Sequence, residues 1–353
     1  MREGLVEVDG SRGEGGGQIL RTSLALSVIT GRPLRMHNIR AGRAKPGLRR
    51  QHLACVEAAA RLCGAELRGA RVGSQELELV PPAAGVHASA DELVIDIGSA
   101  GSTSLVVQTI LVPAIVSGRA FRASVIGGTH NPMAPPYDFL DRVFVPQLRA
   151  MGADVTLTLE RHGFAFGGGP SHDQQTRHRG EVTLAIGPSG LRPLELIETG
   201  PITARHATAI LARLPTHVAE RELAVVQEQC GFAPIECEVR EVKVAGTANV
   251  LMLEVERAGA RELVTGFGEK GLRAEVVAER ACRELSRFLA ANVPVGEHLA
   301  DQLLLPLAVA GGGRFRSAPL SLHATTNIDT LRLFLDVPIR VEPEGDAVVV
   351  TVG

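Results

Sequence analysis

Hydrophobic residues in the first 80 positions alternate between two spacings, one typical of strands and one typical of helices. Short apolar runs predict strands, and apolar residues three and four positions apart predict helices. The predicted order is strand, helix, strand, helix and a closing hairpin. In chain order these segments are residues 5–8, 18–29, 34–39, 48–62, 66–72 and 76–80.

Two later stretches repeat this order of segments. The first has a strand at 92–97, a helix opened by GSAGSTS, a strand at 121–126, a helix at 137–151 and strands at 155–159 and 182–186. The second has a helix at 299–310, a strand at 320–323, a helix at 327–335 and strands at 339–341 and 347–352. Three strand–helix units of similar length indicate an internal triplication.

Residues 197–293 do not follow this rhythm. They predict a helix at 218–229, a strand at 249–255 and a helix at 274–289. We therefore predict an α/β (α+β) protein in which residues 1–196 and 294–353 form a large domain of three repeated units. Residues 197–293 form a smaller α+β domain inserted between the second and third units. Glycines at 167–169 and the polar run at 171–180 predict exposed loops near the boundary.

Composition narrows the class of protein. The chain has 353 residues, of which 45% are hydrophobic and 22% charged, as in a globular protein without extensive disorder. Its longest apolar stretch, 105–116, is too short to span a bilayer and predicts a buried helix, so no membrane partner is expected. The N-terminus lacks the pattern of a secretory signal, and five cysteines without a CxxC pair predict reduced thiols in a cytoplasmic protein.

Charge and aromatic content restrict how nucleic acid would bind. The net charge is −2, so the chain lacks the large net positive charge typical of proteins that bind long nucleic acid along its backbone. It has no Trp and one Tyr, which argues against a platform of aromatic rings for single-stranded bases. An RNA partner is therefore expected to bind by its end.

The segment SRGEGGGQILRTSLAL, residues 11–26, is the strongest local feature. A Gly-rich turn between a strand and a helix presents free backbone N–H groups and the positive end of a helix dipole, which suits an anion. The run is neither of the two familiar nucleotide loops, GxGxxG and GxxxxGK[ST]. A tight turn that binds nothing is equally compatible with the spacing alone. Glu14 and Arg21, which flank the predicted anion site, favour binding.

A second candidate is the basic segment at 39–53. Arg40, Arg43, Lys45, Arg49 and Arg50 place five cations in eleven residues with no acid among them. Bound phosphate would relieve their mutual repulsion. The alternative is a solvated basic face, which the run by itself favours slightly.

A third candidate is His323, at the predicted junction of an apolar strand and a polar turn. A single histidine is more often structural than catalytic, and His52, His130 and His298 lie in comparable settings.

The absence of three sequence motifs argues against three other kinds of site. The chain has no HExxH, no GxSxG and no lysine in a KxDG context, which argues against a zinc site, a hydrolase elbow and a lysine-adenylate ligase.

Six motifs in order resemble the RNA 3′-terminal phosphate cyclase family, and specifically the cyclase proper. They are SRGEGGGQILRT, RRQHL, GSAGSTSLVVQT, GGTHNPMAPP, VGEHLADQLLLP and LHATTNI. The resemblance covers nearly the whole chain and is weakest across 197–293, where the family carries its own inserted domain.

The resemblance implies a covalent mechanism. A histidine, here His323, attacks the α-phosphorus of ATP and becomes a histidine–AMP while pyrophosphate leaves. AMP then passes to an RNA 3′-phosphate, and the adjacent 2′-OH closes a 2′,3′-cyclic phosphate and releases AMP. Covalent catalysis of this kind divides one difficult condensation into easier displacements. A divalent metal, Mg²⁺ or Mn²⁺, is expected to accompany the ATP.

The resemblance also assigns site residues. Those expected to hold the nucleotide are Glu14, Gln18, Gln108, Pro135, His298, Leu299, Ala300, Asp301 and Gln302. Those expected to hold the RNA phosphate are Arg21, Arg40, Arg43 and Gln51, and Glu14 is the candidate metal ligand. His298 stands where the family often has a tyrosine, so altered nucleotide affinity is expected.

Two other functions remain open at this point. A branch of the family acts in ribosome biogenesis without cyclase activity, and it would bind RNA without turning over ATP. Enolpyruvyl-type transferases are also built from repeated α/β units around anionic substrates. The LHATTNI motif and the small number of lysines, three in the whole chain, argue against the transferase.

Overall fold

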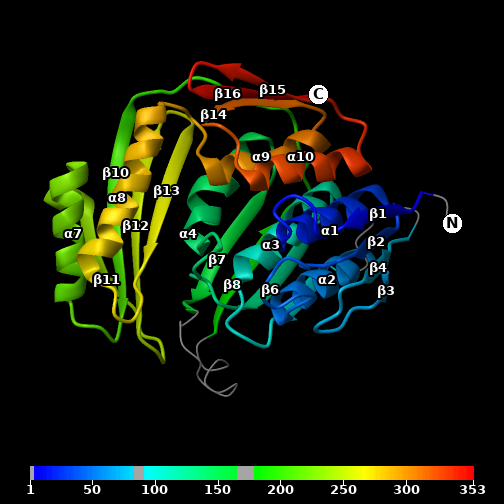
Figure 1. Cartoon of the computed structure of the whole chain (residues 1–353), viewed down its shortest axis with the longest axis horizontal. Helices are drawn as coiled ribbons and strands as arrows, with labels where there is room; N and C mark the ends of the chain where they lie inside the picture. The colour runs from blue at the N-terminus through cyan, green and yellow to red at the C-terminus, as the bar shows by residue number, and fades with distance from the viewer. Residues whose placement is uncertain (1–3, 83–90, 165–178) are drawn as a thin grey trace.

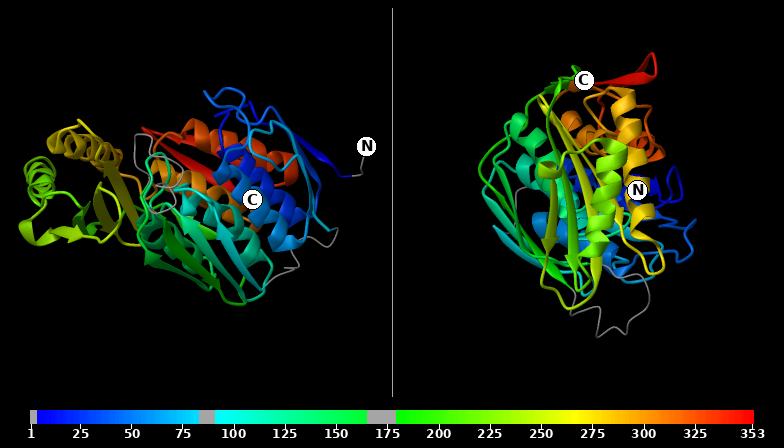
Figure 2. Two further views of the ribbon diagram at one scale, coloured as in Figure 1. Left: turned by 90° about the horizontal axis from the view of Figure 1, so that it is seen from below. Right: turned by 90° about the vertical axis from the view of Figure 1, so that its left-hand side faces the viewer.

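The computed structural model describes residues 4–82, 91–164 and 179–353. Of the predicted loops at 167–169 and 171–180, residues 167–169 and 171–178 lie outside these ranges, and Gly180 begins strand β8, Gly180–Ile186. Within the described residues, sixteen strands form four separate four-stranded sheets. Three sheets surround a central group of helices, and the fourth stands to one side with two helices of its own (Figures 1 and 2).

The first unit has the predicted order of elements. Its strands pair in the order β1-β2-β4-β3, with β1 parallel to β2 and the other neighbours antiparallel. Glycines in the left-handed region end both helices, Gly31 after the first and Gly64 after the second. The bounds are β1 Val6–Asp9, α1 Gln18–Thr30, β2 Leu34–His37, α2 Arg50–Cys63, β3 Glu66–Arg68 and β4 Leu77–Val80.

The second unit repeats the same pairing in the order β5-β6-β8-β7. The single helix predicted at 137–151 is instead interrupted by a π-helical turn. Pro146 follows that turn, and a proline cannot donate to the carbonyl four residues earlier. The bounds are β5 Glu92–Asp96, α3 Thr103–Val116, β6 Phe121–Gly127, α4 Tyr137–Phe139, η1 Leu140–Phe144, α5 Val145–Ala150, β7 Val155–Arg161 and β8 Gly180–Ile186.

The third unit begins with a strand that the sequence analysis missed. This strand, β9, lies parallel to β14, as β1 lies parallel to β2 and β5 to β6. The chain therefore enters residues 197–293 after the first strand of the third unit and not before it. The sheet order is β15-β16-β14-β9. The bounds are β9 Leu194–Leu196, α9 Glu297–Val309, β14 Gly313–Ser317, α10 Leu322–Phe334, β15 Ile339–Glu344 and β16 Ala347–Val352.

The strand predicted at 320–323 was wrong. The strand lies earlier, at β14, and His323 is the second residue of helix α10. Ser321 precedes the helix, and its hydroxyl oxygen accepts a hydrogen bond of 3.3 Å from the Ala324 N–H. Such a cap satisfies a backbone donor in the first turn and starts the helix within the apolar run that had suggested a strand.

Residues 197–293 form a sheet of order β11-β10-β12-β13 with α7 and α8 packed side by side against it. Only β12 of these strands was predicted. This sheet and its two helices bury a hydrophobic cluster separate from the main core. The division into two domains at residues 196 and 294 stays a prediction, which the separate clusters support. The bounds are β10 Ile202–Ala212, α7 His217–Cys230, η2 Pro234–Glu236, β11 Cys237–Glu241, β12 Ala248–Arg257, β13 Ala260–Phe267 and α8 Ala274–Ala291.

The helices of the three units contact one another at the centre of the larger body. Helix α1 touches α2, α3 and α10, and α9 touches α3 and α10. Helix α3 is buried along almost its whole length, which explains the apolar run at 105–116. Among the described residues, no helix combines the length and apolar character needed to cross a membrane. This packing brings the first turns of α1, α9 and α10 together.

Candidate active site

The Gly-rich turn before α1 is closed by the side chain of Glu14. One carboxylate oxygen accepts a 3.0 Å hydrogen bond from the Gln18 N–H, at the start of the helix. The other accepts from the Arg43 guanidinium at 2.9 Å, so the turn is joined to the basic segment. Negative charge at a helix N-terminus is favourable because it lies next to the positive end of the helix dipole. The Glu14 side chain is thus buried within the turn, and each of its two carboxylate oxygens accepts a hydrogen bond.

Gly13 brings this turn against helix α10. Its φ of +57° lies in the left-handed region, and a Cβ placed there would stand 2.1 Å from the Thr326 hydroxyl. That hydroxyl accepts a 3.1 Å hydrogen bond from the Glu14 N–H. Only glycine permits this close approach.

We predict that Gly13→Ala destabilises the protein more than a matched variant does. Gly118 is also left-handed, at φ +67°, but no atom lies within 4 Å of the added Cβ. Gly118→Ala should therefore cost only the backbone strain of about 1–2 kcal/mol. Gly13→Ala should cost at least about 2 kcal/mol more, because Thr326 must move. Urea unfolding measures both losses, and equal losses would show that the contact with Thr326 is unimportant.

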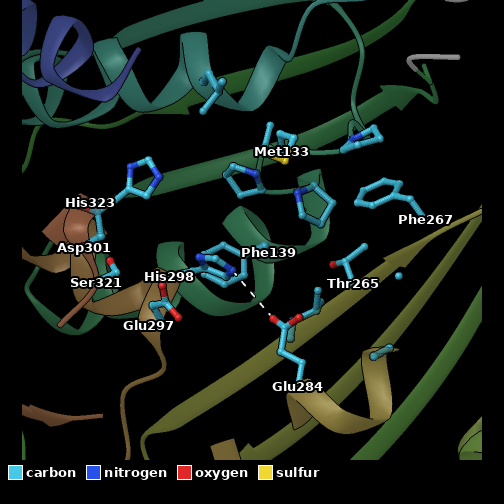
Figure 3. A pocket seen from close by; sticks show the side chains of 18 of the residues that line it. Met133, Phe139, Thr265, Phe267, Glu284, Glu297, His298, Asp301, Ser321 and His323 are labelled. Atoms are coloured by element: carbon cyan, nitrogen blue, oxygen red, sulfur yellow. Dashed lines mark ion pairs between the residues drawn. The ribbon is translucent and has the colours of Figure 1, made fainter. Parts of the chain in front are cut away.

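His323 lies exposed at the opening of a cavity, in the first turn of α10. The free N–H groups of such a turn and the positive end of the helix dipole favour an anion close to this histidine. Figure 3 shows His323 and Asp301 on the same side of the cavity. The histidine therefore combines solvent access with an environment suited to phosphate.

Asp301 connects three helices beneath His323. Its carboxylate accepts hydrogen bonds from the Gln18 amide at 2.5 Å and from the Asn327 amide at 3.1 Å. Burial raises the pKa of Asp301, while the hydrogen bond from Gln18 and the charges of His323 and Arg21 oppose that rise. These bonds set the relative positions of the N-terminal halves of α1, α9 and α10.

Arg21 supplies positive charge to the floor of the site. Burial lowers the pKa of its guanidinium below the ordinary value, and the nearby Asp301 and Glu14 carboxylates oppose this effect. His52 is buried beside it, and burial together with the charges of Arg40 and Arg21 lowers the pKa of His52 to about 3. His52 is therefore neutral at neutral pH, and it adds no charge to the surrounding arginines.

The basic segment is folded back on itself and on its neighbours. Arg40 has a φ of +56°, and its guanidinium donates to the carbonyls of Lys45 and Gly47 at 2.8 and 3.0 Å. Burial, followed by the charge of Arg43, lowers the pKa of Arg40. The Gln51 side-chain oxygen accepts a 2.6 Å hydrogen bond from the backbone N–H of Ser102, the N-cap of α3. Arg40, Arg43 and Gln51 do not line the cavity that His323 faces.

The cavity has a volume of about 530 Å³, within the usual range for small-molecule sites. Its walls combine aromatic rings with charged groups (Figure 3), and glutamine side chains add amides. Three of the predicted nucleotide-binding residues do not line it: Leu299 and Ala300 are buried in the core, and Glu14 lies in the Gly-rich turn. The predicted residues that do line it are Gln18, Arg21, Gln108, Pro135, His298, Asp301, Gln302 and His323.

One wall of the cavity comes from residues 197–293, whose role the sequence left open. Thr265 and Phe267 of β13 and Glu284 of α8 line it. The His298 ring lies 4.0 Å from the Glu284 carboxylate and edge-to-face with the Phe139 ring, at 6.3 Å between centroids. Strand β13 and helix α8 therefore help to enclose the site.

Sequence reasoning missed the roles of Thr326 and Asn327. Both follow His323 at helical spacing, and both are buried in contacts with the Gly-rich turn or Asp301. The polar run ATTN after the histidine would have indicated them, had the helix been predicted to begin at the Ser321 cap.

A metal cage made only of protein side chains does not fit here. The described residues contain no group of three or more His, Cys, Asp or Glu side chains arranged to hold an ion. Glu14, the predicted ligand, already accepts from Arg43 and from the Gln18 N–H. Mg²⁺ often takes one carboxylate and completes its shell with water and substrate phosphate, so Glu14 can serve only as one ligand among these.

Comparison with known proteins decides the family. The family model described as RNA 3′-terminal phosphate cyclase matches residues 12–341. The chain belongs to the RNA 3′-terminal phosphate cyclase family. The match covers most of the three units and the whole inserted segment, so the membership predicted from six motifs is confirmed.

Individual members of the RNA 3′-terminal phosphate cyclase family are similar along nearly the whole chain. The cyclase of Ectopseudomonas mendocina is 45% identical over 96% of this chain and 95% of its own length. That of Koribacter versatilis is 42% identical over 96% and 92%, and that of Pseudomonas fluorescens 45% over 99% and 97%. This chain is accordingly an enzyme of the cyclase family.

Proposed function

We propose that this chain converts an RNA 3′-terminal phosphate to a 2′,3′-cyclic phosphate at the expense of ATP, through an AMP carried on His323. The observation that carries the proposal is the position of His323. It is exposed at the mouth of a nucleotide-sized cavity, in the first turn of a helix, and the half-buried Arg21 and Asp301 line the same cavity. This is the arrangement that a nucleophile toward a phosphate ester requires.

The first step joins His323 to AMP. A neutral ring nitrogen attacks the α-phosphorus of ATP, a nitrogen–phosphorus bond forms, and the bond to the bridging oxygen breaks so that pyrophosphate leaves. The attacking nitrogen carries no proton, and the proton on the other ring nitrogen then passes to solvent. Charge on the transferring phosphoryl group needs fixed cations and N–H dipoles. Arg21 and the first turn of α10 are the groups in position to provide them.

The nucleoside of ATP would occupy the rest of the cavity. Pro135 and Phe139 offer apolar surfaces for a base, and Gln108 and Gln302 offer amides. Among the described residues, the Gln302 side-chain oxygen is buried without a hydrogen-bond partner. Such an unpaired acceptor costs free energy unless a bound molecule donates to it. A nucleotide with an exocyclic amino group is a suitable donor.

The second and third steps transfer AMP and close the ring. An oxygen of the RNA 3′-phosphate attacks the AMP phosphorus, and the nitrogen–phosphorus bond to His323 breaks. The 2′-OH then attacks the terminal RNA phosphorus, its proton passes to solvent, and the bond to AMP breaks so that AMP leaves. We assign the RNA phosphate to Arg40, Arg43 and Gln51, beside the Gly-rich turn. A bound Mg²⁺ or Mn²⁺, with Glu14 as one ligand, would neutralise phosphate charge.

The test uses two RNA oligonucleotides that differ at one atom. RNA ending in a 3′-phosphate should yield a cyclic phosphate and AMP with ATP present. The same RNA with a 2′-deoxy terminal nucleotide should accumulate as the adenylylated species, because it lacks the attacking hydroxyl. Mass spectrometry of the RNA products distinguishes the two. Recovery of the first RNA unchanged, from protein that binds it, would favour the non-catalytic alternative instead.

A further inference from the structure

An exposed methionine stands at the rim of the cavity, on the loop between β6 and α4. Met133 is 97% exposed, whereas Met36, Met151 and Met252 are buried. Its φ of +62° lies in the left-handed region, which residues other than glycine adopt at a cost. The protein therefore holds a large apolar side chain in solvent and in an unfavourable backbone conformation.

Buried polar side chains fix the base of the loop that carries Met133. The buried His130 ring lies 2.8 Å from the Asp138 carboxylate, across the base of the loop. The Asn131 amide donates a 2.8 Å hydrogen bond to the Ala100 carbonyl. Prolines on both sides of Met133 restrict the backbone further. Surroundings that maintain an unfavourable conformation in this way are typical of functional positions.

The position of Met133 indicates what it contacts. It lines the same cavity as His323 and Phe267, and Figure 3 shows it between these two side chains in that view. A thioether is polarizable and makes favourable contacts with aromatic rings. A ligand that enters the cavity with a flat aromatic group would cover this exposed side chain.

We propose that Met133 is a nucleobase contact that contributes to substrate affinity. The inference rests on the proposed function, because that function supplies two sources of the base, the adenine of ATP and the terminal base of the RNA. The chemistry of the contact is the same for both. The experiment must therefore distinguish the two sources.

Oxidation of Met133 provides a readout independent of activity. Dilute hydrogen peroxide converts an exposed thioether to the sulfoxide while the peroxide is reduced to water. Among the described methionines Met133 is the exposed one, so peptide mass spectrometry should find it oxidised first. ATP, RNA with a 3′-phosphate and inorganic triphosphate are then added separately. The His323→Ala variant is used so that no turnover occurs.

We expect one nucleotide ligand to slow oxidation of Met133 several-fold and inorganic triphosphate to have no effect. Protection by ATP assigns the base to adenine, and protection by RNA alone assigns it to the RNA end. Equal protection by inorganic triphosphate, or protection by neither nucleotide ligand, would overturn the proposal.

Substitutions give the second readout. Met133→Gly removes the side chain and also relieves the left-handed strain, so the melting temperature should not fall. The KM for the protecting substrate should nevertheless rise about two- to tenfold, and Met133→Leu should largely restore it. Ile235→Gly is the matched control, because Ile235 is 93% exposed but does not line the cavity. If the wild type is an active cyclase and Met133→Gly has the same KM as the wild type, the proposed contact is absent but the proposed function stands.

Discussion

Replacing His323 by alanine is expected to abolish labelling of the protein by α-labelled ATP, with a loss of cyclase activity on the order of 10⁴-fold or more. The expected loss is large because, in the proposed mechanism, the imidazole itself forms the covalent bond to AMP. The fold should be retained. His323 is exposed, and the adjacent cap is provided by Ser321, which the substitution leaves in place.

The measurement is incubation with α-labelled ATP and a divalent metal, followed by denaturing electrophoresis. Acid should release the label and alkali should not, because a phosphoramidate has that stability. His298→Ala is the matched control, since His298 is another exposed histidine lining the same cavity. It should keep the label and lose only nucleotide affinity. A label that persists on the His323 variant would place the nucleophile elsewhere, and an unlabelled wild type would remove support for the covalent mechanism.

Replacing Glu262 by glutamine is expected to stabilise the protein at alkaline pH. Glu262 lies on β13, is 5% exposed, and has a carboxylate oxygen without a hydrogen-bond partner among the described residues. Burial, followed by the charges of Glu284 and Glu297, raises the pKa of Glu262 to about 8. The oxygen abuts Gly296, where a Cβ would stand 1.8 Å from it, so the structure leaves no room for a compensating side chain.

The sign of the effect follows from proton binding. The ordinary pKa of a glutamate is 4.5, so between about pH 4.5 and pH 8 the folded state holds a proton that the unfolded state has released. Stability from this group is fully present below the unfolded pKa and falls as the pH rises toward the folded pKa. The loss amounts to about 3 kcal/mol between pH 5 and pH 8. Glutamine does not ionise, so the variant should not lose this stability.

Urea unfolding at pH 5, 6.5 and 8 measures the free energy of unfolding of both proteins. The difference in favour of Glu262→Gln should grow as the pH rises. Glu342→Gln, at an exposed position on β15, is the control and should leave the pH dependence unchanged. A variant whose stability falls in parallel with the wild type would show that Glu262 is ionised in the folded protein. The contact between the Glu262 carboxylate and Gly296 bears on the site because Gly296 immediately precedes α9, which carries His298 and Asp301.

Much of the fold was predictable because hydrophobic periodicity is local. The strands and helices of the first unit occur within a few residues of their predicted bounds, and the repeated order predicted three units. Errors arose where a local signal was ambiguous or short. An apolar run before His323 suggested a strand although Ser321 starts a helix there. Strand β9 has only three residues, and the sequence alone does not show that it pairs with β14.

For the site, too, some features were predictable from the sequence and others were decided by the tertiary structure. The sequence by itself determined the family and the order of the motifs, and through that resemblance it singled out His323 as the candidate nucleophile, because motifs depend only on which residues follow one another. The tertiary structure alone decided that Asp301 joins α1, α9 and α10, and that β13 and α8 supply a wall of the cavity. It also directed Leu299 into the core while the adjacent His298 lines the cavity. Which face of a helix meets the core depends on the elements packed against it, and those contacts join segments far apart in the chain.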